Sequence, residues 1–530
     1  MKSKKITQIK NLIIPAIVFG SFTGMLTSLV VVLYELCAHK AIALSEAFYC
    51  LLRERWYLLP VILPLTVGIA FVLGKVYKKI PNIKGGGIPT TIGILRDVIS
   101  FRWLHTLIGT FAASLLSFLI GIPLGTEGPS VMMGTSIGMG VTIPVRSHEA
   151  WSRYSMTGGA CAGFSVATGA PVSGIVFAIE EAHQRISPMI FLVSAVAVTV
   201  SHFTTAIIAP VFGVEPRLFP SLEVVSLSVS EIWLPLVIGV LFGIFAVVFL
   251  KWYRLAASAV SGRFGNIPAL WRISAVIALT LVFGMISFQF ISTGHHLIGE
   301  VMEGHISIVM LGLILLARCF LTVAANTNSL TGGIFLPLMA MGAVFAGLIA
   351  SVAVKLGLDQ SYYTAIVVIG ISACISGMMK MPLTAIIFSV EALSCGGNII
   401  HVVVASTAAF AITEIFGAEC INDTVLEHRL SQHKKETELR VFDTFVTVQK
   451  DSFAVGKQVR DILWPANFFV LSVRHSCDNA ADVDAHGAHP ISEGDVIHIR
   501  YSTENEELTK KEITSIVGDQ NYAEFEDTVI

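Results

Sequence analysis

The sequence predicts an all-α polytopic membrane protein, built as an inverted repeat of tilted and broken helices and followed by a small α+β domain. Three observations predict this fold. Of the 530 residues, 54% are hydrophobic and only 14% are charged, whereas a soluble domain carries about 25% charged residues. Long apolar stretches fill residues 11 to 420, while the C-terminal part has a soluble composition. Glycine- and proline-containing motifs of the first half recur in the second half.

The apolar stretches fall into two length classes. A simple spanning helix needs about 20 apolar residues, and the stretches of that class are 11–36, 57–77, 102–122, 187–211, 230–255 and 305–325. Shorter pieces, interrupted by Gly and Pro, indicate broken or re-entrant helices at 87–98, 129–143, 156–168, 171–182, 334–352, 364–378 and 382–394. Irregular backbone survives at membrane depth only where protein or a polar cavity satisfies its N–H and C=O groups. The short pieces therefore indicate an internal cavity.

Two pairs of motifs repeat in the same order. GTEGPSVMMG at 125–134 recurs as GIFLPLMAMG at 333–342, and PVSGIVFAIEEA at 171–182 recurs as PLTAIIFSVEAL at 382–393. The pairs imply a duplicated gene half, and repeats with interrupted helices are typical of transporters whose site lies at the repeat interface. The alternative is an ancient duplication without a functional site.

Composition and charge define the expected domains and their sides of the membrane. We expect a cytoplasmic N-terminus at 1–10, a first repeat at 11–212, a linker at 213–228, a second, inverted repeat at 229–432 and a cytoplasmic domain at 433–530. Lysines precede the first span and follow the second one, so a cytoplasmic N-terminus puts both clusters in the cytoplasm. We expect both termini on that side. The net charge of −2 gives no basic field for nucleic acid, so none is expected as a partner. The eight cysteines show no metal-ligand spacing, and no metal is expected.

Three motifs place glycines directly before a short helix: GGGIP at 85–89, GTEGP at 125–129 and GGIFLP at 332–337. The first N–H groups of a helix lack internal partners, and the peptide dipoles add partial positive charge there. Such helix ends bind anions without a full cation, and weak binding permits rapid release. We expect the three ends to surround one ion.

Glu127 lies inside the second motif, between apolar stretches. An ionisable group at membrane depth is by default functional, and this carboxylate would compete with the anion and leave its place when protonated. The alternative is a helix-capping glutamate near an aqueous surface. Arg318, which also lies in an apolar run, is expected to bind backbone carbonyls or an acid rather than the ion.

Acidic residues end both helices of the second repeated pair. Glu180 and Glu181 end the first helix and Glu391 ends the second, although the helix dipole disfavours acids at a C-terminus. One of them is a candidate proton relay. The alternative is surface pairing with Arg185, Lys380 or other basic groups.

At these residues the sequence resembles the CLC family of chloride channels and proton-coupled chloride antiporters, over about residues 10–432. GGGIP is similar to the family's GSGIP, GTEGP to its GREGP and GGIFLP to its GGxFxP, in the same order. The resemblance implies a homodimer with one pore in each subunit, each subunit being an inverted repeat. It further implies a multi-pass protein, which we expect in a prokaryotic cell membrane.

The resemblance also implies roles for individual residues. Glu127 matches the external gating glutamate and proton carrier, and Glu181 matches the internal proton-transfer glutamate of many antiporters. The function implied is exchange of chloride, or a similar monovalent anion, for protons; the alternative is a passive voltage- or pH-gated chloride channel. Chloride is then a substrate, no cofactor is expected, and the protein is not an enzyme. The implied anion-binding positions are Gly86, Gly87, Ile88, Gly128, Ile334, Phe335 and Asn422.

Three positions depart from the family pattern. Gly86 stands where the family has its selectivity-filter serine, Asn422 where it has the pore tyrosine, and Thr126 where it has an arginine. The first two changes alter both side-chain contacts to the anion. They predict a more open and less selective central site, which a comparison of chloride, nitrate, bromide and fluoride flux would test.

The C-terminal part reads as short strands, VFDTFVTV, NFFVLSV and DVIHIRYS, followed by a polar helix at 505–517. This part resembles the TrkA-C (RCK C-terminal) regulatory domain, which implies ligand sensing or dimerisation and a small bound ligand. Four residues suggest a metal, but their spacing matches no standard site and favours a solvated loop: His475, Cys477, His486 and His489.

Overall fold

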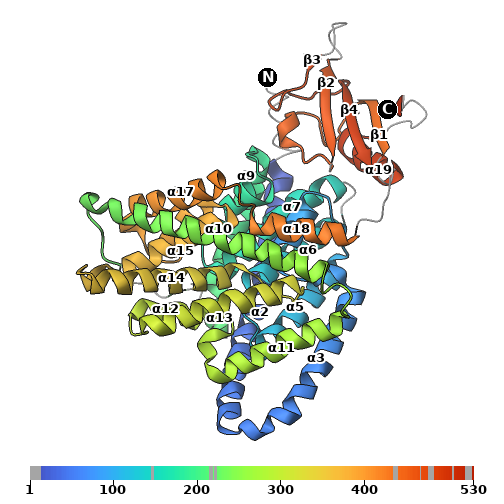
Figure 1. Ribbon diagram of the computed structural model, residues 1–530. Coiled ribbons are helices and arrows are strands. Elements are labelled where there is room, and N and C mark those ends of the chain that lie inside the picture. Colours follow the sequence, from blue (N-terminus) through green and yellow to red (C-terminus); the bar gives the residue numbers. More distant parts are fainter. Residues whose placement is uncertain are drawn as a thin grey trace.

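The computed structural model describes residues 13–144, 148–213, 219, 224–433, 440–465, 467–475, 483–503, 506–519 and 528–529. A large helical body carries a small sheet domain at one end, next to helices α7 and α18 (Figure 1). The predicted fold class is confirmed: a polytopic helical protein followed by an α+β domain. The expected N-terminal segment 1–10 and most of the linker 213–228 lie outside the described residues.

The first half of the body alternates long helices with short ones. Its helices are α2 (Ile14–Glu54), α3 (Leu59–Lys79), α4 (Ile88–Leu95), α5 (Trp103–Ile120), α6 (Glu127–Thr142), α7 (His148–Thr168), α8 (Pro171–Phe177) and α9 (Pro188–Ile208). Single turns connect them: η2 (Trp56–Leu58), η3 (Pro81–Ile83), η4 (Ala178–Ala182) and η5 (Ala209–Phe212).

The second half has the same alternation. Its helices are α10 (Trp233–Ser261), α11 (Ala269–Ile286), α12 (His295–Glu303), α13 (Ile308–Thr327), α14 (Phe335–Lys355), α15 (Tyr363–Met379), α16 (Pro382–Glu391), α17 (Ile399–Ile415) and α18 (Ile421–His433). The connecting turns are η6 (Val229–Glu231), η7 (Phe288–Phe290), η8 (Gln360–Tyr362) and η9 (Gly396–Asn398).

Within the described residues, ten helical segments are long and apolar enough to cross a membrane. Helix α15 is the most enclosed of them and α3 the least. The sequence interpretation missed α11 and α17, and it wrongly expected short pieces at α14 and α15. Pro337 prompted that expectation for α14, but it lies in the first helical turn, where a missing N–H breaks no helical hydrogen bond.

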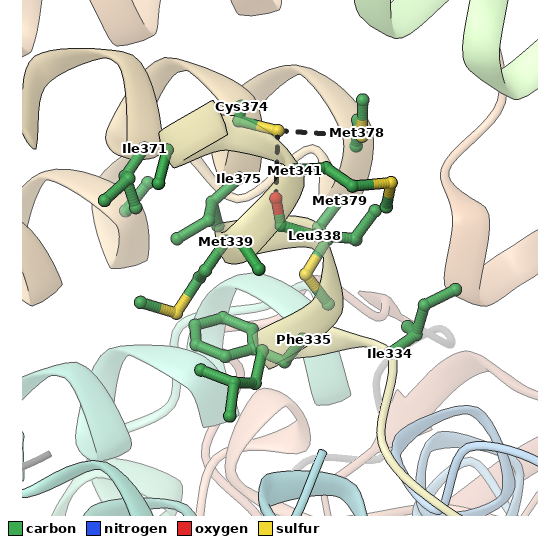
Figure 2. Packing of buried hydrophobic residues seen from close by; sticks show 14 of the residues in the cluster. Ile334, Phe335, Leu338, Met339, Met341, Ile371, Cys374, Ile375, Met378 and Met379 are labelled. Carbon is green, nitrogen blue, oxygen red and sulfur yellow. Dashed lines mark hydrogen bonds between the residues drawn. The ribbon is translucent and has the colours of Figure 1, made fainter. Parts of the chain in front are cut away.

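Matched glycines bring matched helices together in the two halves. A Cβ on Gly134 of α6 would lie 2.0 Å from the carbonyl oxygen of Gly159 on α7. A Cβ on Gly342, the equivalent residue of α14, would lie 2.8 Å from the Cβ of Cys374 on α15. Figure 2 shows the resulting core, in which the Cys374 thiol contacts the carbonyl oxygen of Leu338 at 3.4 Å. The repeated motifs therefore repeat a packing interface as well.

The C-terminal domain is an antiparallel sheet with one helix. Its elements are β1 (Arg440–Thr447), η10 (Val459–Asp461), β2 (Phe468–Arg474), β3 (Val483–Asp484), β4 (Val496–Thr503), α19 (Glu506–Val517) and β5 (Thr528–Val529). The strand order is β3-β2-β4-β1-β5. The three predicted strands correspond to β1, β2 and β4, whose alternate side chains form a core with α19.

This domain packs on helix α7 through both polar and apolar contacts. Arg153 donates to the carbonyl oxygen of Leu463 at 3.1 Å, and the Leu463 N–H donates to the Tyr154 hydroxyl at 3.0 Å. The rings of Trp151 and Phe453 meet edge to face with centroids 5.3 Å apart. The sheet domain and the membrane body thus share one continuous buried cluster.

Candidate functional site

The three glycine motifs meet at the centre of the body through their backbones. The Gly125 N–H donates to the Gly333 carbonyl at 2.6 Å, and the Gly333 N–H donates to the Gly125 carbonyl at 2.7 Å. The Gly332 N–H also donates to the Gly85 carbonyl at 3.4 Å. Since Gly125 and Gly333 are equivalent positions of the repeat, this isolated bridge joins the two halves at matching points.

Glycine is required at several of these positions because the backbones almost touch. A Cβ on Gly128 would lie 2.0 Å from the carbonyl oxygen of Gly86 and 2.7 Å from the Cα of Gly333. Gly87 has a φ of +73°, which L side chains rarely adopt. The predicted anion positions Gly86, Gly87 and Gly128 are therefore neighbours in space.

Three helix N-termini begin at this crossing. Ile88 opens α4, Glu127 opens α6, and Ile334 is the N-cap residue of α14, whose first residue is Phe335. All four side chains are buried. The ends of α4, α6 and α14 carry partial positive charge from their peptide dipoles, which favours an anion at the place where they meet.

Glu127 projects its carboxylate into this crossing. The side chain is 0% exposed, and neither carboxylate oxygen has a hydrogen-bond partner among the described residues. Two backbone N–H groups interact electrostatically with the carboxylate: that of Glu127 itself and that of Leu336 in the first turn of α14. A capping glutamate near an aqueous surface does not fit, because this side chain is fully enclosed and makes no capping bond.

A second buried acid, which sequence reasoning missed, lies beside Glu127. Glu35 of α2 accepts a hydrogen bond from the Ser130 hydroxyl at 3.4 Å, and its charge interacts with that of Glu127. Thr126 stands where the resembled family has arginine, and its side chain interacts with the Glu35 carboxyl group. The available signal was an acid within the long apolar run of the first span.

Glu181 is buried and touches another predicted site residue. The Asn422 side-chain N–H donates to a Glu181 carboxylate oxygen at 2.9 Å. Arg96 donates to the backbone carbonyls of Glu181 at 2.9 Å and Ala182 at 3.1 Å, and forms an ion pair with Asp423 at 3.3 Å. The resemblance implied that Asn422 contacts the anion, but its side-chain amide donates one hydrogen bond to Glu181.

A π-helical turn, η4, contains the two adjacent glutamates, Glu180 and Glu181. The His183 N–H bonds to the Ala178 carbonyl, five residues back, at 3.1 Å. Glu181 lies buried at Asn422, whereas Glu180 reaches the start of α16. Its carboxylate accepts the N–H of Leu383 at 2.9 Å and both the N–H and the hydroxyl of Thr384 at 2.7 Å.

Glu391, the repeat equivalent of Glu180, makes the same contacts in reverse. It accepts the N–H of Val172 at 2.8 Å, and the N–H and hydroxyl of Ser173 at 2.9 and 2.8 Å, at the start of α8. Each acid thus lies at a favourable N-terminus of the other half. The alternative of surface pairing with Arg185 or Lys380 does not describe Glu180 and Glu391, whose carboxylates bind these helix starts.

Those two cations have other partners. Lys380 pairs with Glu414 at 2.6 Å, and Arg185 donates to the Ile462 carbonyl at 3.3 Å. Arg318 donates to the backbone carbonyls of Gln289 at 2.8 Å and Ile291 at 2.6 Å. Its predicted role as a tie to carbonyls is confirmed.

A half-buried cation lies against the first glycine motif, although the motif itself contains none. Arg429 of α18 donates to the Thr90 hydroxyl and to the Lys84 carbonyl. A Cβ on Gly85 would collide with its guanidinium group. Sequence reasoning missed this residue because it belongs to a polar helix, α18, far along the chain from the motif.

Of the histidines of the sheet domain, His486 is exposed, as the solvated-loop interpretation predicts, whereas His489 is buried and contacts His475. His475 bonds to Asp495 at 3.1 Å, and its other ring nitrogen lies 3.0 Å from that of His489, which is only 5% exposed. Cys477 lies outside the described residues. Within the part of the chain that the structure describes, no group of three potential metal ligands is present.

Residues 68–414 match the protein family described as voltage gated chloride channel. The fold is similar to that of a slow cyanobacterial Cl⁻/H⁺ antiporter, with a TM-score of 0.69 and 21% identity over 79% of this chain and 99% of the other. A eukaryotic CLC transporter gives 0.65 and 16% over 79% and 74%. A CLC-type fluoride/proton antiporter gives 0.63 and 20% over 76% and 96%.

The family match covers well over half of the chain and includes the GTEGP and GGIFLP motifs. The structural likeness to the first of these proteins covers 79% of the chain. Together with the ten apolar helices, these findings make the protein a multi-pass integral membrane protein. The chain belongs to the voltage-gated chloride channel family.

Proposed function

We propose that the protein exchanges chloride, or a similar monovalent anion, for protons, with Glu127 as the gate. The observation that carries the proposal is the Glu127 carboxylate, fully buried and without a hydrogen-bond partner among the described residues. It lies where the helix ends of α6 and α14 favour negative charge. A charged Glu127 fills the place of the anion, and protonation removes the competing charge.

Two further carboxyl groups support proton movement. Glu35 interacts with Glu127 across the start of α6, so charge on one disfavours charge on the other. Glu181, bonded to Asn422, is the proposed inner proton station. The three acids lie on different elements, α2, α6 and η4. This separation suits the stepwise transfer of a proton from one carboxyl group to the next.

The test is simultaneous measurement of anion and proton flux in liposomes for the wild type, Glu127→Gln and Glu181→Gln. We expect Glu181→Gln to keep anion flux and lose proton flux, and Glu127→Gln to lose proton flux together with the pH dependence of anion flux. Glu180→Gln is the matched control, because Glu180 caps α16 and should leave proton flux intact. Proton flux that is equal in the wild type and all variants would refute Glu127 and Glu181 as the proton stations, and anion flux without proton flux in the wild type would establish a passive channel.

The proposal extends to assembly and to the C-terminal domain. We propose a homodimer, with both chain termini in the cytoplasm and the sheet domain acting as a TrkA-C-like regulatory unit that binds a small ligand. The regulatory role is supported by the contact between the sheet domain and α7, where Arg153 binds both Leu463 of the domain and Asp97, just after α4. Asp97 directly follows Arg96, which holds the backbone of Glu181.

A further inference from the structure

Asn326 is a buried amide in the last turn of α13, close to the glycine crossing. Its side chain is 4% exposed. The amide oxygen accepts a hydrogen bond from the Tyr253 hydroxyl at 2.5 Å. The amide nitrogen has no partner among the described residues. A buried N–H without an acceptor costs free energy, so this group calls for a partner.

The unpartnered nitrogen faces Gly86. A Cβ built on Gly86 would lie 3.7 Å from the Asn326 amide nitrogen and 3.4 Å from the nearest heavy atom, on Pro89. Gly86 stands where the resembled family has a serine, and it directly precedes Gly87, the N-cap residue of α4. The amide nitrogen of Asn326 therefore lies on the side of the crossing to which a side chain at position 86 would point.

The charge around this point favours an anion over a cation. The N-terminus of α4 contributes the positive end of its dipole. Arg429 lies against Gly85, and its charge also reaches Tyr253, the partner of Asn326. An amide N–H adds a neutral donor to these positive groups, which strengthens selectivity without the tight hold of a second full cation.

We propose that the side-chain N–H₂ group of Asn326 binds the transported anion at Gly86 and takes the place of the hydroxyl that Gly86 lacks. The Tyr253 hydroxyl fixes its orientation, because it engages the amide oxygen and leaves the N–H₂ group toward the anion. The ligand class is a small monovalent anion. The inference rests on the proposed anion pathway and assigns its side-chain donor.

The experiment measures chloride affinity by calorimetry, and the chloride dependence of flux, on the full-length protein. We expect Asn326→Ala to weaken chloride binding about tenfold, which corresponds to about 1.4 kcal/mol. Gly86→Ser in the same chain should restore most of the affinity, since a side chain at position 86 fits without collision. Asn328→Ala, on the same helix end, is the control; its amide bonds to the Ala324 carbonyl at 2.9 Å, and its removal should leave affinity unchanged.

The outcomes separate this inference from the exchange proposal. Affinity of Asn326→Ala within twofold of the wild type, or a loss that Gly86→Ser does not reverse, overturns the role of Asn326 while leaving transport intact. If Asn326→Ala does not fold, Asn326→Asp keeps the size and should weaken binding still more, by replacing a donor with a carboxyl group. A wild type that neither binds nor moves chloride overturns both proposals.

Discussion

Gly87 meets the carbonyl of Gly128 so closely that a Cβ on Gly87 would lie 2.2 Å from that oxygen. The residue also has a φ of +73°. A residue with a Cβ loses roughly 1–2 kcal/mol in a left-handed backbone conformation. The collision of that Cβ with the Gly128 carbonyl would add to this cost.

Gly87→Ala should therefore destabilise the protein by more than about 2 kcal/mol and abolish anion flux. Thermal unfolding in detergent and liposome flux are the measurements. Gly86→Ala is the neighbouring control, because its Cβ would have no heavy atom closer than 3.4 Å and no positive φ. Equal melting temperatures for the two variants would contradict this account.

Loss of either reciprocal cap should destabilise the helical body to a similar extent. Glu180→Ala removes three acceptor contacts at α16, and Glu391→Ala removes three at α8. We expect each change to cost about 1–2 kcal/mol in thermal unfolding. Glu414→Ala, which breaks a half-exposed pair with Lys380, should have almost no effect. A cap variant no less stable than Glu414→Ala would show that the caps are not needed.

Arg153→Lys should loosen the sheet domain from the membrane body. The guanidinium of Arg153 contacts Leu463, Asp97 at 2.5 Å and Glu512 at 3.5 Å, and a single ammonium cannot bridge all three. We expect faster hydrogen exchange at the Leu463 amide and easier proteolysis near it. Arg460→Lys serves as the control, since the Arg460 side chain donates to the Gln458 side chain, two residues away in the same exposed turn, at 2.8 Å. Unchanged protection in Arg153→Lys would rule out this anchoring role.

The sheet domain should gain stability as the pH rises from about 7 toward the ordinary lysine range. Burial lowers the pKa of Lys457 to about 7, with Asp461 acting in the opposite direction. Between that pKa and the unfolded value near 10.4, the unfolded chain holds a proton that the folded chain does not. Stability then rises by about 1.4 kcal/mol per pH unit, and below about pH 7 the slope disappears because both states are protonated.

Urea unfolding of the full-length protein, followed through a ¹⁹F label on Trp464, measures this slope between pH 7 and pH 9. The ring of Trp464 stacks on Phe468 within the domain, so its signal reports unfolding there. Lys457→Met should remove the dependence and raise stability at pH 7. A slope that persists in Lys457→Met would assign the titration to another group.

The sequence predicted what its local patterns encode. Glycines before short helices predicted that three helix ends would meet, and the repeat predicted the counterpart of GTEGP. The structure joins these motifs through Gly125 and Gly333. By contrast, the partners of Glu180 and Glu391 lie about 200 residues away and are backbone N–H groups. No side-chain pattern marks such a donor, so the sequence left only a proton relay or pairing with nearby cations as interpretations of these acids.

Asn326 and Glu35 escaped prediction for different reasons. An asparagine near the end of a helix, in the run NTNS, has the composition of an ordinary helix terminus. Its importance appears only when Tyr253 and Gly86 are placed beside it. Glu35 stood within an apolar span and could have been singled out by the cost of a buried charge.

The exchanged glutamates have a consequence for each half taken alone. A chain that ended near residue 212 would lack the start of α16, to which Glu180 binds. It would also lack Glu391, the acceptor for the N–H groups of Val172 and Ser173. The second half would be left equally incomplete. An ancestor of half this length would have closed both helix ends only by pairing with a second copy of itself. A duplication of such a half would place in one chain a contact that two chains had shared.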